Sequence, residues 1–185
     1  VRQELGLDNK LVVGHVGRLH PQKNHEFLLK VFSEIKKKRQ DAVLILVGSG
    51  PLEHDIKEKV KALGLEKSVI FLGNRKDMDY IYQGMDVCIF PSLFEGLGIV
   101  AIEAQAAGLP VVCSDGFPKE ACVTPLFKRM NLSDAPSEWA KVALDMVNNE
   151  YCHKNMKDYI VKSGFDMDET ALKMQRYYLK KSGVH

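Results

Sequence analysis

The stretch DVCIFPSLFEGLGIVAIEAQAAGLPVVCS, residues 86–114, decides the fold of this chain. Two short apolar runs, at 86–90 and 110–114, have the length of buried strands. Between them, residues 97–107 are rich in small apolar side chains and stop at Gly108, which predicts a helix. A strand, a helix and a second strand in this order predict two parallel strands joined by a crossover helix.

The same alternation continues on both sides of this unit. Upstream, strands are expected at 11–16, 42–47 and 68–72, with helices at 24–38, 51–63 and 76–85 between them. Downstream, one more strand is expected at 127–132, and helices at 136–148, 151–163 and 168–181. We therefore predict an α/β fold: one doubly wound, Rossmann-like parallel sheet with helices on both faces. One domain is expected over residues 1–185, with a helical C-terminal tail at 165–185.

Composition excludes several classes of protein. The chain has 185 residues, and 26 Lys and Arg against 24 Asp and Glu give a net charge of +2, so no general affinity for nucleic acid is expected. A hydrophobic content of 45% is too high for a disordered chain, and no apolar run is long enough to span a membrane. The start VRQELGLDNK has no initiator Met and no signal-peptide pattern, and it reads as a piece of a longer protein.

The four cysteines form no Cys-x-x-Cys pair and no zinc-finger spacing. Cys88 and Cys113 lie inside apolar runs and are expected to be buried, reduced thiols, which indicates a cytoplasmic location. His15, His20 and His25 recur every five residues, so no two share one face of a helix, and no metal site is expected.

The first candidate site is GHVGRLHPQKN, residues 14–24, which follows a predicted strand and opens a predicted helix. Gly17 lets the backbone approach a ligand, and a helix N-terminus offers free N–H groups. Arg18 and Lys23 add two cations, so the segment suits a doubly anionic group such as a pyrophosphate. It matches neither the dinucleotide-binding fingerprint nor the Walker loop. The alternative is a tight turn with solvated basic residues.

The second candidate site is FEGLGIVAIEA, residues 94–104. Glu95 precedes the predicted helix and Glu103 lies two turns inside it. A carboxylate can accept hydrogen bonds from two vicinal hydroxyls, so carboxylates beside phosphate-binding amides would suit a sugar nucleotide. The alternatives are a favourable charge near a helix N-terminus for Glu95 and a solvated helix face for Glu103.

In combination, these motifs resemble the C-terminal, nucleotide-sugar-binding domain of the GT-B glycosyltransferases, specifically the retaining family 4, or group 1, enzymes. The resemblance is carried by GRLHPQKN at 17–24, VGSGP at 47–51, FLGNRKDM at 71–78 and PSLFEGLGIVAIEAQAAGLPVV at 91–112. The last block contains the family's Glu-x7-Glu motif as Glu95 and Glu103. The chain looks most similar to bacterial exopolysaccharide or capsular polysaccharide transferases.

The resemblance implies roles for individual residues. Arg18 and Lys23 would bind the donor diphosphate and stabilise the leaving nucleoside diphosphate, and Glu95 would contact the transferred sugar; these three are the expected catalytic residues. Glu103 would hold the ribose. The other expected donor-binding residues are Gly17, Asn74 and Arg75 beside the nucleobase, and the backbone of Gly96, Leu97, Gly98 and Ile99. No metal and no other cofactor is expected.

The resemblance also implies one half of a two-domain GT-B enzyme whose N-terminal acceptor domain is absent from this chain. The whole enzyme would move a hexose, with retention, from a nucleoside diphosphate sugar to an acceptor glycan, which can be lipid-linked. It would work in the cytoplasm, peripherally at the inner face of the plasma membrane, and the fragment alone would be inactive. Three alternatives stay open: a nucleotide-sugar epimerase, a glycogen-synthase-like enzyme, and a non-catalytic nucleotide-sensing module.

Overall fold

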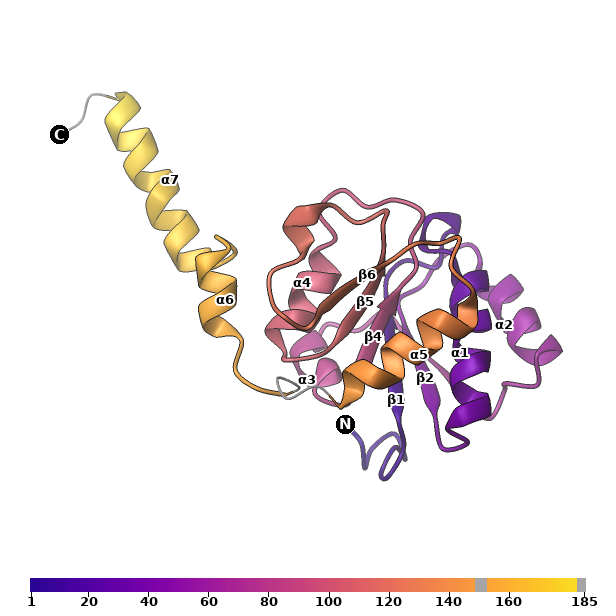
Figure 1. The fold of residues 1–185 in the computed structure, drawn as a ribbon. Coiled ribbons are helices and arrows are strands. Elements are labelled where there is room, and N and C mark those ends of the chain that lie inside the picture. Colours follow the sequence, from indigo (N-terminus) through magenta and orange to yellow (C-terminus); the bar gives the residue numbers. More distant parts are fainter. Residues whose placement is uncertain (149–152, 183–185) are drawn as a thin grey trace.

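A six-stranded, fully parallel sheet forms the centre of the molecule (Figure 1). The computed structural model describes residues 1–148 and 153–182. The strands are β1 (Val12–Val16), β2 (Val43–Val47), β3 (Val69–Gly73), β4 (Val87–Phe90), β5 (Val111–Ser114) and β6 (Phe127–Met130). Their order in the sheet is β3-β2-β1-β4-β5-β6, so the chain reverses its direction of travel across the sheet between β1 and β4. In parallel sheets, ligands bind beyond the carboxyl ends of the strands at such a switch point.

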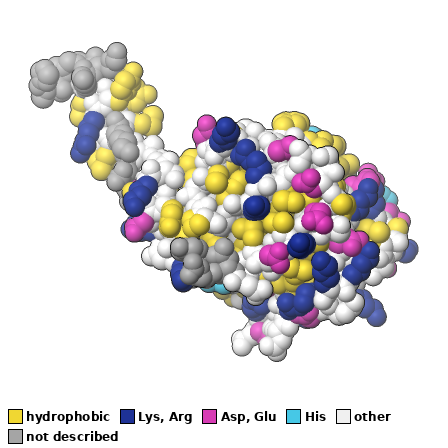
Figure 2. Space-filling view, viewed as in Figure 1, with side chains coloured by type: hydrophobic (Ala, Val, Ile, Leu, Met, Phe, Trp, Pro, Cys, Tyr) yellow, Lys and Arg dark blue, Asp and Glu magenta, His cyan; other side chains and the backbone are white. Residues whose placement is uncertain are grey.

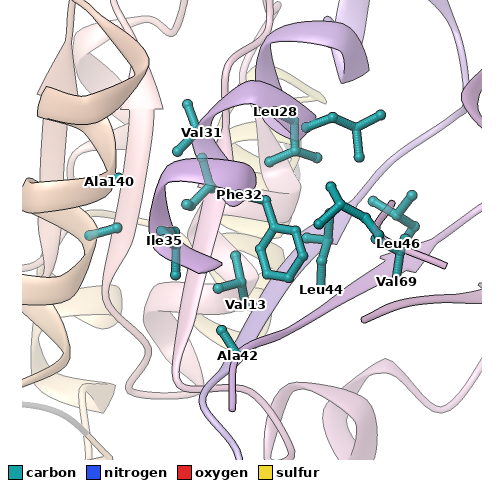
Figure 3. Packing of buried hydrophobic residues seen from close by; sticks show 14 of the residues in the cluster. Val13, Leu28, Val31, Phe32, Ile35, Ala42, Leu44, Leu46, Val69 and Ala140 are labelled. Carbon is teal, nitrogen blue, oxygen red and sulfur yellow. The ribbon is translucent and has the colours of Figure 1, made fainter. Parts of the chain in front are cut away.

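Helices cover both faces of this sheet, which confirms the doubly wound prediction. On one face lie α1 (His25–Lys38), α2 (Glu53–Ala62) and α5 (Pro136–Val147), and on the other α3 (Met78–Tyr82) and α4 (Ile99–Ala106). Neighbouring residues of β1 serve opposite faces: Val13 belongs to the cluster that contains α1, and Val12 belongs to the cluster that contains α4. Figure 3 shows the first of these clusters, in which Val13 and Leu44 of the sheet lie against α1.

The C-terminal part of the chain is helical, as predicted. Two helices, α6 (Lys157–Lys162) and α7 (Met167–Ser182), follow α5, and α7 extends away from the sheet (Figure 1). Two short 3-10 turns complete the elements, η1 (Pro21–Lys23) before α1 and η2 (Lys119–Ala121) before β6. Among residues 1–148 and 153–182, no helix is long and apolar enough to cross a bilayer.

The predicted starts of four helices are wrong by two residues or more. The helix expected at 51–63 begins at Glu53. The helix expected at 97–107 begins at Ile99, because Gly98 has a left-handed φ of 75° that a helix interior does not accept. The helix expected at 76–85 is only Met78–Tyr82, with Asp77 as a non-helical N-cap. The helix expected at 151–163 begins at Lys157, whose backbone N–H is capped by the Asn155 side chain at 2.8 Å; positions 151 and 152 lie outside the described residues.

The predicted burial of two cysteines is confirmed. Cys88 and Cys113 are buried free thiols in β4 and β5, and burial raises the pKa of both. Cys122 is free and exposed. The surface is mixed in sign: on the face drawn in Figure 2, basic and acidic side chains are interspersed, as expected from a net charge of +2.

Candidate functional site

A hollow of about 520 Å³ opens at the carboxyl edge of the sheet, where β1 and β2 end. Its lining comes from the loops after β1, β2 and β3 together with α3 and α4. Five residues that the sequence singled out lie in this lining: Gly17, Arg18, Asn74, Arg75 and Glu103. Residues as far apart in the chain as Val16 and Glu103 therefore meet at the carboxyl edge of the sheet, beside the switch point between β1 and β4.

The floor of the hollow depends on a close approach between two loops. Gly17 donates its N–H to the Val47 carbonyl at 2.9 Å, and Leu19 donates to the Ser49 carbonyl at 3.0 Å. Gly48 has a φ of 127°, and a Cβ at this position would lie 2.2 Å from the Gly17 oxygen. Only glycine fits there without moving the Gly17 backbone. Across the loop, the Ser49 hydroxyl donates to the Asn74 side-chain oxygen at 3.1 Å.

The two arginines of the lining differ in how they are held. Arg75 makes a two-pronged ion pair with Asp77, with N–O distances of 2.9 and 2.6 Å. This pairing lowers the pKa of the Asp77 carboxyl. Arg18 is exposed, and within the described chain it takes part in no ion pair. Arg18 is therefore the lining cation whose charge is available to an anionic ligand.

Lys23 and Glu95 lie outside this lining and bind each other. The Lys23 ammonium contacts the Glu95 carboxylate at 2.5 Å, and the two side chains are only 15% and 8% exposed. The surrounding loops are fixed by two further bonds, from the Leu93 N–H to the Gln22 carbonyl and from the Gln22 amide to the Phe94 carbonyl, each 2.8 Å long. The first turn before α1 is thereby tied to the β4–α4 loop.

The loop at the start of α4 is exposed. Gly98 is the N-cap of α4, and no side chain caps the first turn, so its backbone N–H groups are not bonded by a side chain. Gly96, Leu97 and Ile99 are exposed, but none of them lines the hollow; from α4, Val100 and Glu103 do. Since α4 begins at Ile99, Glu103 lies about one turn into the helix rather than two.

Glu103 has a partner that no sequence pattern indicates. The Tyr82 hydroxyl, on α3, donates to a Glu103 carboxylate oxygen at 3.1 Å. Tyr82 is only 2% exposed, and burial raises the pKa of its hydroxyl. No motif marks Tyr82, because its contact with Glu103 arises from the packing of α3 against α4 and not from any spacing along the chain.

A pair of buried histidines was also not foreseen. The rings of His15 and His25 meet edge to face with centroids 4.8 Å apart. His15 bonds the Ile89 carbonyl through Nδ1 at 2.8 Å, so this nitrogen carries the hydrogen. Burial lowers the pKa of His15 to about 4 and of His25 to about 3, and the nearby Lys23 charge adds to both shifts. Both rings are therefore neutral at pH 7.

The acidic residues near the hollow do not gather into a metal-binding group. Asp77 and Asp79 have Asp-x-Asp spacing, but the Asp77 carboxylate is bonded to Arg75. Among the described residues, no group of three or more His, Cys, Asp or Glu side chains is placed to hold a metal ion.

A family model described as "Glycosyl transferases group 1" matches residues 1–165. Over 165 residues the chain is 34% identical to "Putative glycosyltransferase EpsF" of Bacillus subtilis, covering 88% of this chain and 43% of that protein. It is 33% identical to the Escherichia coli "UDP-Gal:alpha-D-GlcNAc-diphosphoundecaprenol alpha-1,3-galactosyltransferase", covering 95% of this chain and 47% of that protein.

Solved structures show the same fold. The crystal structure of Anabaena Alr3699/HepE in complex with UDP-glucose superposes with a TM-score of 0.79 at 25% identity. That match covers 98% of this chain and 51% of the Anabaena chain. The chain thus spans about half the length of the relatives that it matches.

Proposed function

Because the chain belongs to the group 1 glycosyl transferases, we propose that it is the donor-binding half of a two-domain enzyme that transfers a hexose from a nucleoside diphosphate sugar. The observation that carries the proposal is the hollow at the carboxyl edge of the sheet. It brings an available cation, Arg18, a closely approaching backbone at Gly17 and a carboxylate, Glu103, together around one space. Such a set matches a ligand with an anionic centre and vicinal hydroxyls.

In this proposal the diphosphate lies over Gly17 with its charge opposed by Arg18. Glu103 accepts hydrogen bonds from the ribose hydroxyls, and the base lies beside Asn74 and Arg75. The backbone of Gly96, Leu97 and Gly98 and the first turn of α4 at Ile99, which no side chain caps, offer N–H groups to the sugar end of the donor. The Ser49 to Asn74 bond and the Arg75 to Asp77 pair support this arrangement, since they fix the side of the hollow assigned to the base.

We assign the transfer step to the region around Lys23 and Glu95, where the turn before α1 meets the β4–α4 loop. The bond from the anomeric carbon to the diphosphate oxygen breaks while the acceptor oxygen bonds to that carbon, and the acceptor's proton passes to the departing phosphate. Arg18 and Lys23 stabilise the charge that develops on the diphosphate, and Glu95 orients the sugar hydroxyls. Arg18, which is in no ion pair among the described residues, supplies neutralising charge without a metal, so we expect nucleotide affinity to be unchanged by EDTA.

The name of one relative supports a lipid-linked acceptor. The Escherichia coli protein is named for a galactosyl transfer to a diphosphoundecaprenol-linked sugar. We therefore propose a lipid-linked acceptor glycan, held by a second domain, and a peripheral cytoplasmic location at the inner face of the plasma membrane.

Calorimetric titration of the chain with UDP, GDP, ADP and their glucose conjugates tests the proposal. One nucleoside diphosphate should bind clearly better than the others. Glu103→Ala should weaken both the free diphosphate and the sugar nucleotide by about 1–3 kcal/mol, because it removes contacts to the ribose. Glu95→Gln should spare the free diphosphate and remove the preference for the sugar-bearing form. Binding of none of the three nucleotides would overturn the proposal.

A further inference from the structure

We infer that Tyr82 is a positioning residue for Glu103: its hydroxyl holds the carboxylate in the orientation that accepts hydrogen bonds from both hydroxyls of a nucleotide ribose. The inference rests on the proposed function and adds a residue that no sequence motif marks. It starts from one contact between two helices, α3 and α4, whose partners lie 21 residues apart in the chain.

The direction of this hydrogen bond is fixed by chemistry. The Tyr82 oxygen lies 3.1 Å from Glu103 Oε2 and 3.3 Å from the Val100 carbonyl oxygen, and both of these atoms can only accept. Burial of the ring raises the pKa of the hydroxyl, so it remains an O–H donor at every physiological pH. A hydroxyl that donates to an ionised carboxylate makes a charge-assisted bond, which is stronger than one between neutral groups.

The position of Glu103 gives this bond a consequence for binding. A second hollow of about 450 Å³ adjoins the first, and Met78 and Glu103 line both. Tyr82 lines only the second hollow. Tyr82 therefore bonds Oε2 of a residue that also lines the first hollow, and no hydrogen bond within the described residues engages Oε1 of the same carboxylate.

The hydrogen bond from Tyr82 fixes the Glu103 carboxylate before a ligand binds. Glu103 is exposed, and an exposed glutamate samples several rotamers that it must give up when it binds a ligand. Tyr82 is held by its burial in the cluster between the sheet and α4, so its hydroxyl is a rigid anchor. A carboxylate that is fixed before binding loses less conformational entropy when a ligand binds. The Tyr82 bond should therefore raise the affinity only for ligands whose hydroxyls bond to Glu103.

The test compares two ligands in one variant. Wild-type chain and Tyr82→Phe are titrated with UDP and with 2′,3′-dideoxy-UDP, or with the matching pair of the base that binds best. Wild type should prefer the ribose form. Tyr82→Phe should weaken UDP about three- to tenfold, the loss of roughly one hydrogen bond, and leave the dideoxy form nearly unchanged. In a Glu103→Ala background, Tyr82→Phe should have no further effect on the ratio of the two affinities.

Tyr80→Phe is the matched control, because Tyr80 lies on the same helix but is 46% exposed and lines neither hollow. It should keep the wild-type ratio. Partial unfolding of Tyr82→Phe would reduce the number of sites for both ligands and leave their ratio unaltered. A wild-type ratio in Tyr82→Phe, or an equal loss for both ligands, overturns the inference alone. A wild-type chain that binds no nucleoside diphosphate overturns the proposed function and this inference together.

Discussion

At the scale of single residues, the two cations assigned to the diphosphate occupy different environments. Arg18 is exposed and in no ion pair among the described residues, whereas Lys23 is paired with Glu95 in a place where both side chains are largely buried. Removing one partner of a buried pair leaves the other charge without compensation, which costs far more than breaking an exposed pair. The same substitution at the two positions should therefore have different consequences.

Arg18→Ala should weaken UDP binding by about 1.5–3 kcal/mol and leave the stability of the fold within about 0.5 kcal/mol of wild type. Lys23→Ala should weaken UDP binding too, and it should also destabilise the fold by about 2 kcal/mol or more, since Glu95 is left without its cation. Calorimetry and urea denaturation measure the two effects. Lys30→Ala is the control, because its pair with Glu26 is exposed; equal stability of Lys23→Ala and Lys30→Ala would contradict the argument.

The buried histidines should make the stability of the fold depend on pH. The folded pKa of His15 is about 4 and of His25 about 3, both below the ordinary 6.5, so the unfolded chain binds more protons as soon as the pH falls below 6.5. Stability should fall between pH 7 and pH 5 by about 2 kcal/mol for each histidine. The Glu26 and Asp41 carboxyls, with pKa values of about 2, stay ionised in this window.

Denaturation at several pH values checks this. His25→Phe keeps an aromatic ring against His15 but cannot titrate, so it should remove about half of the fall in stability. His54→Gln, at an exposed position on α2, should leave the pH dependence unchanged. A wild-type chain of constant stability from pH 7 to 5 would show that the pair is not neutral in the fold.

At the scale of elements, the sheet was predictable and the helix starts were less so. Apolar runs such as VLILV at 43–47 predict buried parallel strands, because both faces of such a strand are covered by helices. All six strands form within the segments predicted from sequence or one residue beyond them. The start of α4 was misplaced because Leu97 continues the apolar pattern, while the left-handed Gly98 interrupts the helix.

Part of the candidate site could likewise be predicted from the sequence, and part could not. Gly17 and Arg18 could be placed at the site from sequence, because residues after parallel strands meet at one edge of the sheet. Asn74, Arg75 and Glu103 are grouped with them through the family resemblance. The pairing of Lys23 with Glu95, and the contact of Tyr82 with Glu103, could not be predicted. Both depend on how loops and helices pack across at least 21 residues of chain, which no local pattern records.

The contact between the loops after β1 and β2 gives a prediction for an element. Gly48→Ala would place a methyl group 2.2 Å from the Gly17 oxygen and force a φ of 127° on alanine. It should destabilise the fold by about 2–4 kcal/mol and displace Gly17, so UDP binding should weaken as well. Gly64→Ala is the matched control: its φ is also positive, at 65°, but nothing lies within 4 Å of the added methyl.

Gly64→Ala should cost only about 1 kcal/mol, the strain of the left-handed backbone, and leave UDP affinity unchanged. Thermal melts and calorimetry distinguish the two variants. If Gly48→Ala binds UDP like wild type, the close approach of the two loops does not shape the nucleotide site.

At the scale of the whole molecule, the site has an open side. Four large apolar side chains of the β4–α4 region are exposed beside Glu95, with exposed fractions from 37% to 62%: Leu93, Phe94, Leu97 and Ile99. Exposed apolar groups around a polar site indicate a surface that another body covers. This agrees with the proposal that a second domain faces the hollow, since the chain spans about half of its relatives.

Residues 1–185 alone should therefore bind a nucleoside diphosphate and transfer no sugar. In the proposed enzyme the groups that bind the donor lie on this chain, but the acceptor hydroxyl must be held beside the anomeric carbon, on the face from which the diphosphate departs. That positioning accounts for several kcal/mol of the barrier of a two-substrate reaction. The measurement is transfer of radiolabelled hexose from UDP-hexose to a lipid-linked acceptor, with a full-length group 1 relative as the positive control. Binding and transfer are measured on the same preparation. A chain that binds UDP and transfers nothing therefore supports the proposal that this chain binds the donor and a second domain holds the acceptor. Transfer by this chain at a rate near that of the full-length relative would show that the acceptor site lies within these 185 residues.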